Sequence, residues 1–279
     1  MIVIDNAEGM RSRENGKPGV LVPTMGALHA GHGKLISHGR RLAGKSGLLI
    51  VSIFINPTQF GPEEDFEAYP RALDEDCSLC AAAGADIVFH PSAADMYHDD
   101  SPDITADAGL IKTLCGPTRP GHFDGVCTAV QRLFELVKPD IAVFGKKDYQ
   151  QLAVIRKMTR GCKLPVRIIG AETVREEDGL AMSSRNRYLN AEQRAQSPAI
   201  RKALLKLKEA TAPETSTRIK IARDVIAREA PLGEISYLQI VDRETMQEIK
   251  AIDRPALAAT AVYFGKARLI DNVEIDATA

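Results

Sequence analysis

Two histidines three residues apart, His29 and His32, are the side chains in this sequence best spaced to act on a charged ligand. They close the segment Met25 to His32, between a short β-forming run and a helical pattern. At a helix start, side chains three residues apart point the same way, and the N-terminus adds free N–H donors and positive potential. Gly31 leaves room for a phosphate at the backbone. The segment predicts a cradle for a transferring phosphate, unless the histidines are accidental surface residues.

A second charged segment, Gly145 to Gln151, also follows a predicted strand and leads into a predicted helix. A lysine here can neutralise phosphates, and Asp148 can hold ribose hydroxyls as the acid of dinucleotide folds does. By itself the segment also fits a solvated helix cap. Its position at the same sheet edge as His29 and His32 favours a role in nucleotide binding.

The segment Asp178 to Asn186 combines two hydroxyls, an arginine and a glycine. Such a composition is typical of a mobile loop that closes over a polyphosphate. The alternative is an interdomain linker with an ordinary surface arginine.

The segment Asn56 to Phe60 follows the most apolar run, Leu48 to Ile55. Gln59 offers both a donor and an acceptor, which suits a small hydroxy acid better than a phosphate. Two further turns, Tyr69 to Arg71 and Arg119 to Phe123, carry polar side chains that fit a structural or a functional role equally well.

A helical pattern from Ala72 to Ala83 contains Asp76, Cys77 and Cys80. We interpret the cysteines as buried thiols rather than half of a zinc site, because no second cysteine or histidine pair completes the spacing. Asp76 could approach Mg²⁺, but we interpret it as an acid on the helix surface. The metal ligands are left unknown.

Strands that alternate with helices must position these segments. The alternation predicts an α/β fold, a doubly wound Rossmann-like parallel sheet followed by a smaller α+β domain. We place the boundary between residues 1–173 and 174–279. The predicted strands are Val20–Val22, Leu48–Ile55, Ile87–Phe89, Asp140–Phe144 and Val166–Ile169. The predicted helices are Gly33–Ala43, Ala72–Ala83, Val126–Val137 and Tyr149–Arg160.

The second domain is predicted to be two helical regions followed by strands. Asn190 opens a helix to about Lys208, which Pro198 breaks or kinks, and a second helix covers Ser216 to Glu229. Strands are expected at Ile235–Val241 and in a hairpin around Gly265.

The composition excludes several classes of protein. The 279 residues carry a net charge of −1, which argues against a nucleic-acid-binding protein. The longest apolar run is far shorter than the roughly 20 residues of a membrane helix, and residues 1–14 lack the apolar core of a signal peptide. Five scattered cysteines suggest no disulfide framework. We therefore expect a cytoplasmic protein that contacts neither nucleic acid nor membrane.

The four segments, in this order, resemble the pantothenate synthetase (pantoate–β-alanine ligase) family of HIGH-motif nucleotidyltransferases. The resemblance extends from about Gly19 to Leu189 and resumes at Arg268–Asn272. It implies ATP-dependent ligation of pantoate and β-alanine through a pantoyl-adenylate, with Mg²⁺ as cofactor and a homodimer as the assembly.

The resemblance also implies roles for individual residues. His32, His29, Lys147, Ser183 and Arg185 would be catalytic, and Gln59 and Gln151 would hold pantoate. ATP would contact Met25, Gly26, Ala27, Leu28, His29, Ala30, Gly31, His32, Gly145, Lys146, Lys147, Asp148, Val174, Met182, Ser183, Ser184 and Arg185.

Two positions depart from the family pattern. Gly33 replaces a larger apolar residue, which would loosen the first helical turn, and Lys146 replaces an acid, which would raise the local positive charge. Three alternatives stay open at this point. A nucleotidyltransferase acting on a phosphorylated acceptor would want basic residues where Gln59 and Gln151 stand. A tRNA-synthetase fragment would be more basic, and a non-catalytic nucleotide-binding module would not need the full set of phosphate-binding side chains.

Overall fold

The computed structural model describes residues 1–12, 19–59, 66, 70–97 and 104–277. Within them the chain forms two compact units. The first unit contains residues 1–107, 119–146 and 154–172, and the second contains residues 108–118, 147–153 and 173–279. The domain boundary expected between residues 173 and 174 stays a prediction. Two short segments that precede it, 108–118 and 147–153, belong to the second unit.

A six-stranded parallel sheet forms the centre of the first unit, in the order β1-β4-β3-β2-β5-β6. The predicted α/β class is therefore confirmed. The central strand β3 is buried along almost its whole length, as its continuous apolar sequence predicts. The strands are β1 (Ile2–Ile4), β2 (Gly19–Thr24), β3 (Leu48–Ile53), β4 (Ile87–Phe89), β5 (Ile141–Gly145) and β6 (Arg167–Ala171).

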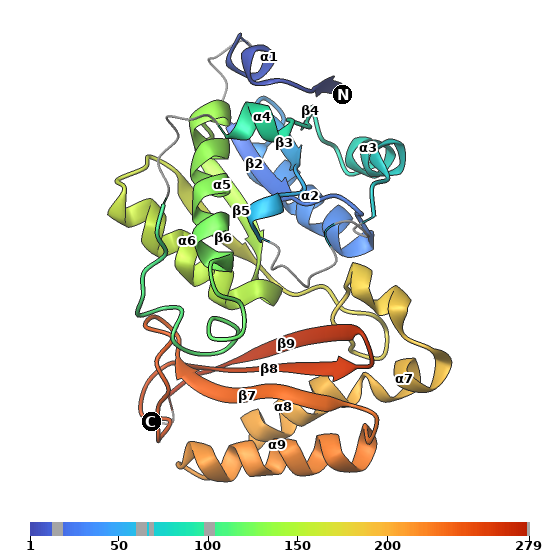
Figure 1. Ribbon diagram of the computed structural model, residues 1–279, viewed down its shortest axis with the longest axis vertical. Helices are drawn as coiled ribbons and strands as arrows, with labels where there is room; N and C mark the ends of the chain where they lie inside the picture. Colours follow the sequence, from blue (N-terminus) through green and yellow to red (C-terminus); the bar gives the residue numbers. More distant parts are fainter. Residues whose placement is uncertain (13–18, 60–65, 67–69, 98–103, 278–279) are drawn as a thin grey trace. The chain divides into compact units, whose positions relative to one another are not determined.

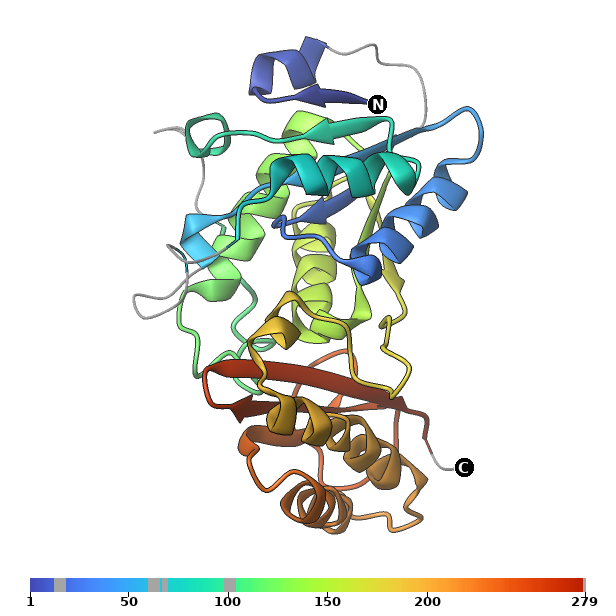
Figure 2. The ribbon, with the colours of Figure 1, turned by 90° about the vertical axis from the view of Figure 1, so that its right-hand side faces the viewer.

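Helices cover both faces of this sheet (Figures 1 and 2). α2 (Ala30–Ala43) and α3 (Leu73–Ala82) lie on one face, and α5 (His122–Val137) and α6 (Tyr149–Gly161) lie on the other. Gly39 lets α2 approach the sheet closely, because a Cβ there would lie 2.8 Å from Leu49 Cδ1 and 2.9 Å from Val22 Cγ2. Neighbouring residues of β2 point to opposite faces, so both helix layers share one buried sheet.

The direction of the strand order reverses between β2 and β5, which are neighbours in the sheet. In open α/β sheets, ligands bind at the carboxyl ends of the strands at such a reversal. The Met25–His32 segment follows β2, η1 (Pro57–Gln59) follows β3, and Gly145 ends β5. The fold thus brings three of the predicted site segments to one edge of one sheet.

The second unit contains an antiparallel sheet in the order β7-β8-β9. Its strands are β7 (Glu234–Asp242), β8 (Ala256–Phe264) and β9 (Ala267–Ile275). The β8–β9 hairpin turns at Gly265, which has a φ of 58°, as predicted. η3 (Ser184–Tyr188), α7 (Ala191–Gln196), α8 (Ala199–Glu209) and α9 (Thr215–Glu229) complete the unit, and Pro198 separates α7 from α8.

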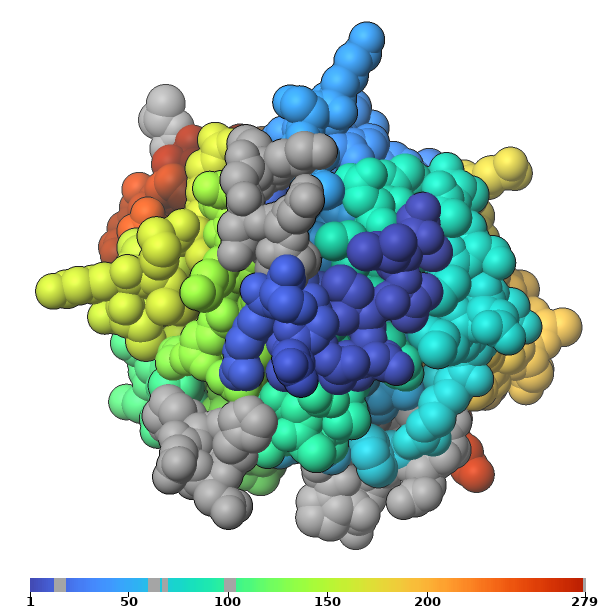
Figure 3. Space-filling model, turned by 90° about the horizontal axis from the view of Figure 1, so that it is seen from above, coloured from blue at the N-terminus to red at the C-terminus, as the bar shows by residue number. Residues whose placement is uncertain are grey.

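Three short elements of the first unit were not predicted from the sequence, namely β1, α1 (Ala7–Ser12) and α4 (Ala93–Met96). β1 pairs with β4, and the Ala7 N–H donates to Asp95 Oδ1 at 2.9 Å. Figure 3 shows the N-terminal segment, in dark blue, against the turquoise residues of this region. A three-residue strand carries too few residues to reveal its period, so long-range pairing rather than local sequence defines β1.

Candidate functional site

The two histidines of the Met25–His32 segment begin helix α2. His29 is the N-cap, and its Nδ1 accepts from the Gly31 N–H at 3.1 Å. The His32 Nδ1 accepts from the His29 N–H at 3.2 Å, which makes a capping box out of two imidazoles. The Gly31 N–H is therefore engaged by a side chain, and the contact of Gly31 with a phosphate stays a prediction.

These bonds also determine the tautomer of both rings. A ring nitrogen that accepts a hydrogen bond carries no proton, so each neutral ring carries its proton on Nε2. The ring centroids lie 4.1 Å apart, which keeps the two Nε2–H groups in one neighbourhood. Two closely spaced N–H donors of this kind suit the oxygens of a phosphate.

Asp76 of α3 holds the turn that precedes the histidines. Its Oδ2 accepts from the Ala27 N–H at 2.9 Å, and its Oδ1 accepts from the Leu28 N–H at 2.6 Å. Gly26 and Ala27 both have positive φ, at 79° and 50°. Ala27 in this conformation is strained, and the two bonds to one carboxylate compensate for that strain.

The interpretation of Asp76 as a surface acid is wrong, because the residue is only 3% exposed. Burial raises its pKa above the ordinary 3.8, while the bonds from Leu28 and Ala27 oppose that rise. The helical spacing contains the signal that the sequence interpretation overlooked. Asp76 lies three residues after Leu73 and four before Cys80, so it shares their inward face.

The cysteines of α3 are free thiols. Cys80 is buried, as predicted, and burial raises the pKa of its thiol to about 12. Cys77 is only half-buried.

The Gln59 segment is held by its backbone. The Gln59 carbonyl accepts from His122 Nδ1 at 2.8 Å and from Arg119 Nη2 at 3.2 Å. Since a carbonyl only accepts, His122 carries its proton on Nδ1, and its Nε2 accepts from Arg119 Nη1 at 2.9 Å. The buried Asn56 adds a bond from its Nδ2 to the Gly125 carbonyl at 3.0 Å. Arg119 and His122, whose role the sequence left undecided, thus fix the backbone that presents Gln59.

Of the predicted turn Tyr69–Arg71, only Pro70 and Arg71 are among the described residues. The Arg71 guanidinium lies 5.6 Å from the ring centroid of Phe66. Tyr69 and Phe60 lie outside the described residues.

Lys146, at the end of β5, forms an ion pair with Glu172, with 2.5 Å between Nζ and Oε1. The expectation that Lys146 raises the local positive charge is therefore wrong. Glu172 comes directly after β6, the neighbour of β5, so the partner acid is supplied by the sheet order.

The remaining predicted residues belong to the second unit. Lys147 and Gln151 are half-buried, and Asp148 is exposed. The adjacent Gln150 is buried and serves the fold, because its amide bonds to the Leu110 and Thr113 carbonyls and to the Cys115 N–H.

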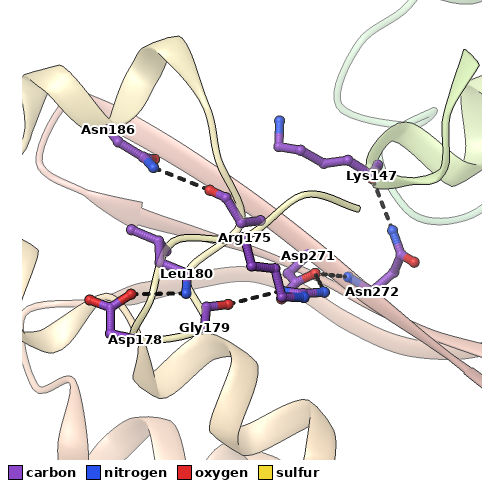
Figure 4. A network of polar contacts seen from close by, with 9 residues as sticks. Lys147, Arg175, Asp178, Gly179, Leu180, Asn186, Asp271 and Asn272 are labelled. Carbon is purple, nitrogen blue, oxygen red and sulfur yellow. Dashed lines mark hydrogen bonds and ion pairs between the residues drawn. The ribbon is translucent and has the colours of Figure 1, made fainter. Parts of the chain in front are cut away.

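The predicted phosphate loop of the second unit follows a small hairpin. Arg175 pairs with Ala181, the Met182 N–H donates to the Val174 carbonyl at 3.0 Å, and Gly179 turns with a φ of 92°. Side chains brace the turn, as Figure 4 shows, with Asp178 accepting from the Leu180 N–H and Asn186 extending toward the loop. The predicted segment Asp178–Asn186 thus begins in a packed hairpin of the second unit and continues into η3, and it is not an extended linker.

η3 carries the next predicted residues. The Ser183 Oγ caps this helix by accepting from the Arg185 N–H at 3.2 Å, and Ser183, Ser184 and Arg185 are half-buried. The Ser183 hydroxyl therefore has a structural task in addition to any contact with a ligand.

Helices that could cross a bilayer are absent from the part of the chain that the structure describes.

Comparison with known proteins identifies the family. Residues 3–274 match the family described as pantoate-beta-alanine ligase. The chain belongs to the pantoate–β-alanine ligase family. It is therefore an enzyme that ligates pantoate and β-alanine at the expense of ATP, and the three alternatives raised by the sequence are set aside.

Individual members of the pantoate–β-alanine ligase family resemble the chain over almost its whole length. A pantothenate synthetase of Akkermansia muciniphila is 49% identical over 257 residues, which are 92% of each chain. A pantothenate synthetase structure from Thermus thermophilus has a TM-score of 0.91 at 39% identity, over 98% of this chain and 99% of that one.

A further ligase structure contains ligands. The pantoate-beta-alanine ligase of Francisella tularensis, solved in complex with beta-gamma ATP and β-alanine, has a TM-score of 0.79 at 30% identity. It covers 98% of this chain and 97% of its own.

Proposed function

We propose that the chain activates pantoate as an acyl-adenylate and that the Met25–His32 segment holds the ATP phosphates during this step. The observation that carries the proposal is the sheet edge at which this segment follows β2, η1 follows β3 and Gly145 ends β5. The tautomers of His29 and His32 supply two Nε2–H donors there. Donors of this kind stabilise the charge that leaves with pyrophosphate.

The other predicted residues complete the proposal. Gln59 and Gln151 hold pantoate by its carboxylate and hydroxyls, and Gln59 also lies beside β-alanine. Lys147 and Arg185, with Ser183, neutralise phosphate oxygens, Asp148 bonds to the ribose, and Val174 lies beside the adenine. The motif resemblance and the family membership support these roles.

The reaction proceeds in two displacements. A pantoate carboxylate oxygen attacks the α-phosphorus of ATP in line, and the bond to the bridging oxygen breaks to release pyrophosphate. The neutral amine of β-alanine then attacks the acyl carbon, loses a proton and expels AMP. Because a carboxylate is already nucleophilic, the first step needs positioning and charge stabilisation rather than an activating base.

We propose that magnesium enters as the MgATP substrate. Mg²⁺ is commonly bound through substrate phosphates with few protein ligands. Among the described residues, no group of three His, Cys, Asp or Glu side chains could hold a metal ion. Both oxygens of Asp76 already accept backbone N–H groups, so this acid fits a metal poorly.

Assembly and location are part of the proposal. We expect a cytoplasmic homodimer whose second unit acts as a lid. The described cysteines are free, which fits a reducing compartment. Ile2 and Val3, on the terminal strand β1, are 58% and 50% exposed and fit a protein contact. Sedimentation equilibrium should give twice the chain mass of 30.3 kDa, and a monomer at micromolar concentration would contradict the dimer.

The test separates the two half-reactions. Pantoate-dependent exchange between pyrophosphate and ATP reports adenylate formation alone, and AMP release that depends on β-alanine reports the second step. We expect His32→Ala and Lys147→Ala each to slow exchange by about 100–1,000-fold while the fold persists. Exchange near the wild-type rate in either variant would remove the role given to that residue.

A further inference from the structure

Strand β9 carries two consecutive buried polar residues, Asp271 and Asn272, which are 3% and 8% exposed. The surrounding β9 positions Leu269, Val273 and Ile275 are apolar and buried, as a packed strand favours. A polar pair inside such a strand breaks the local pattern, and such breaks are expected where function imposes them.

Asp271 holds the hairpin that leads into Met182–Arg185. Arg175 donates to Asp271 with both of its terminal nitrogens, at 2.7 and 2.9 Å, and to the Gly179 carbonyl at 3.0 Å. Figure 4 shows this guanidinium between the carboxylate and the turn. A bidentate pair fixes direction as well as distance, so it orients the hairpin on β9.

Asn272 holds the other ATP-binding segment of this unit. Its Nδ2 donates to the Lys147 carbonyl at 2.9 Å. Figure 4 shows the Lys147 side chain extending away from Asn272. The bond from Asn272 therefore fixes the backbone of Lys147 and does not restrain its ammonium group.

The two contacts are coupled. The Asn272 N–H donates to Asp271 Oδ1 at 2.8 Å, so the carboxylate that binds Arg175 also fixes the next residue of the strand. Two segments that lie about thirty residues apart in the chain therefore meet on one dipeptide.

We propose that Asp271 and Asn272 are positioning residues for ATP, which hold Lys147 and the Met182–Arg185 segment in a fixed relation. The inference rests on the proposed role of these segments in binding ATP. Stability alone explains the pair poorly, because a buried ion pair is often no more stabilising than apolar residues of similar volume. Small displacements of positioned groups, in contrast, are costly for catalysis.

Three variants test the proposal. Asp271→Asn removes the charge that pairs with Arg175, Arg175→Lys keeps the charge but loses the bidentate geometry, and Asn272→Ala removes the bond to Lys147. Asp253→Asn is the matched control, because Asp253 also pairs with an arginine, Arg254, in this unit but lies on the surface.

We expect a selective effect on ATP. In pyrophosphate exchange, the KM for ATP should rise by about 10-fold or more in the three variants, in line with the cost of misplacing a positioned group. The KM for pantoate and the rate of β-alanine attack on supplied pantoyl-adenylate should stay within about 2-fold, and D253N should match the wild type throughout.

Double variants distinguish the contact between Asp271 and Arg175 from the contact between Asn272 and Lys147. R175K and D271N disrupt the same pair, so their combined effect should be close to that of either alone. N272A acts on the other segment, but both contacts meet on the bonded pair Asp271–Asn272, so its effect combined with that of R175K should be smaller than the product of the two.

Two results would overturn the proposal. One is a wild-type KM for ATP in folded N272A and R175K, which decide the matter even if D271N does not fold. The other is an equal loss for all three substrates, which indicates general destabilisation. If K147A also exchanges normally, the proposed role of the Lys147 segment fails as well. If K147A is impaired while N272A and R175K are normal, only the positioning role fails.

Discussion

The turn at Gly26 and Ala27 that precedes the histidines (the histidine turn) and the Arg175–Ala181 hairpin of the second unit are each held by a buried aspartate, but in different ways. Asp76 accepts two backbone N–H groups and thereby fixes a left-handed turn at Gly26 and Ala27. Asp271 accepts two hydrogen bonds from the guanidinium of Arg175, and so it fixes the hairpin through a side chain of the hairpin rather than through its backbone.

The difference shows what each region requires. A turn of two consecutive positive-φ residues is costly, and direct bonds to its backbone resist relaxation of that strain. A hairpin with its own backbone pairing is already formed, and it needs only to be oriented on the sheet. We therefore expect changes at Asp76 to alter the local conformation and changes around Asp271 to alter placement.

Among changes to the residues that hold the two turns, the largest expected effect is that of Asp76→Asn. The amide keeps the shape but turns an N–H donor toward one of the two backbone donors, so one bond is lost. A hydrogen bond to a charged group is worth roughly 1.5–3 kcal/mol, so adenylate formation should fall about 10–100-fold, as measured by pyrophosphate exchange. Asp74→Asn, on the exposed side of the same helix, is the control. Equal activity of D76N and D74N would show that the turn does not depend on the buried carboxylate.

A pair of glycine variants compares the two turns directly. Gly26 and Gly179 both have positive φ, but a Cβ on Gly26 would lie 3.1 Å from Asp76 Oδ2 and one on Gly179 would lie 3.5 Å from Arg201 Cγ. Gly179→Ala should cost about 1–2 kcal/mol for the backbone conformation alone. Gly26→Ala adds crowding and should cost about 2–4 kcal/mol. Urea unfolding measures both, and an equal cost would mean that the histidine turn is no more constrained than the hairpin.

A smaller effect is expected at Gly33, in the first turn of α2. A Cβ there would lie 3.5 Å from Leu79 Cδ2, an ordinary contact. Gly33→Ala should therefore raise the free energy of unfolding by about 0.5–1 kcal/mol, because alanine favours the helix. Gly39→Ala, on the same helix, should destabilise the fold, because the new Cβ would lie 2.8 Å from Leu49 Cδ1. A loss of stability in G33A would show that not even a methyl group fits at this position.

The smallest effect is a pH dependence of opposite sign in the two regions. Burial raises the pKa of Asp76 above 3.8, so its contribution to stability is present below that value and is lost as the pH rises through the folded-state pKa. For Asp178 burial acts the same way, but the bonds from Arg194 and the Leu180 N–H outweigh it and lower the pKa. The stabilisation by Asp178 is therefore present above pH 3.8 and is lost as the pH falls.

Asparagine variants of Asp76 and Asp178 measure the sign of each pH dependence. Relative to the wild type, D76N should gain free energy of unfolding and D178N should lose it as the pH is raised from about 3.5 to about 7. Urea titrations across this range give both differences. Curves of the same sign would contradict the contrast between the two acids.

Much of the fold was predictable from the sequence, because long periodic elements are determined locally. The central strand β3, the helices α3 and α6, the break at Pro198 and the turn at Gly265 all follow from apolar spacing and from proline and glycine. β1 and α4 were missed because they have only three and four residues, and their position depends on distant partners.

The candidate site was predictable as segments but not as hydrogen bonds. The sequence identifies His29, His32 and Gln59, but it does not show that Asp76, or Arg119 with His122, holds their backbone. Glu172 was missed as the partner of Lys146 because the pair depends on β5 and β6 being neighbours. Such bonds join residues far apart in the chain, so local spacing can indicate that Asp76 is buried but not which backbone groups it binds.

The imidazoles of His29 and His32 cap helix α2 through Nδ1, and in the proposed function the Nε2–H of each ring binds the ATP phosphates. Each side chain would then have two separate tasks. An asparagine can meet the first demand, since it is a preferred residue at the start of a helix, but it has no second ring nitrogen for the other. His29→Asn should thus keep α2 intact by circular dichroism and still lose adenylate formation. The start of this helix tolerates several residue types, so loss of adenylate formation in a folded H29N variant would assign the need for histidine to the chemistry.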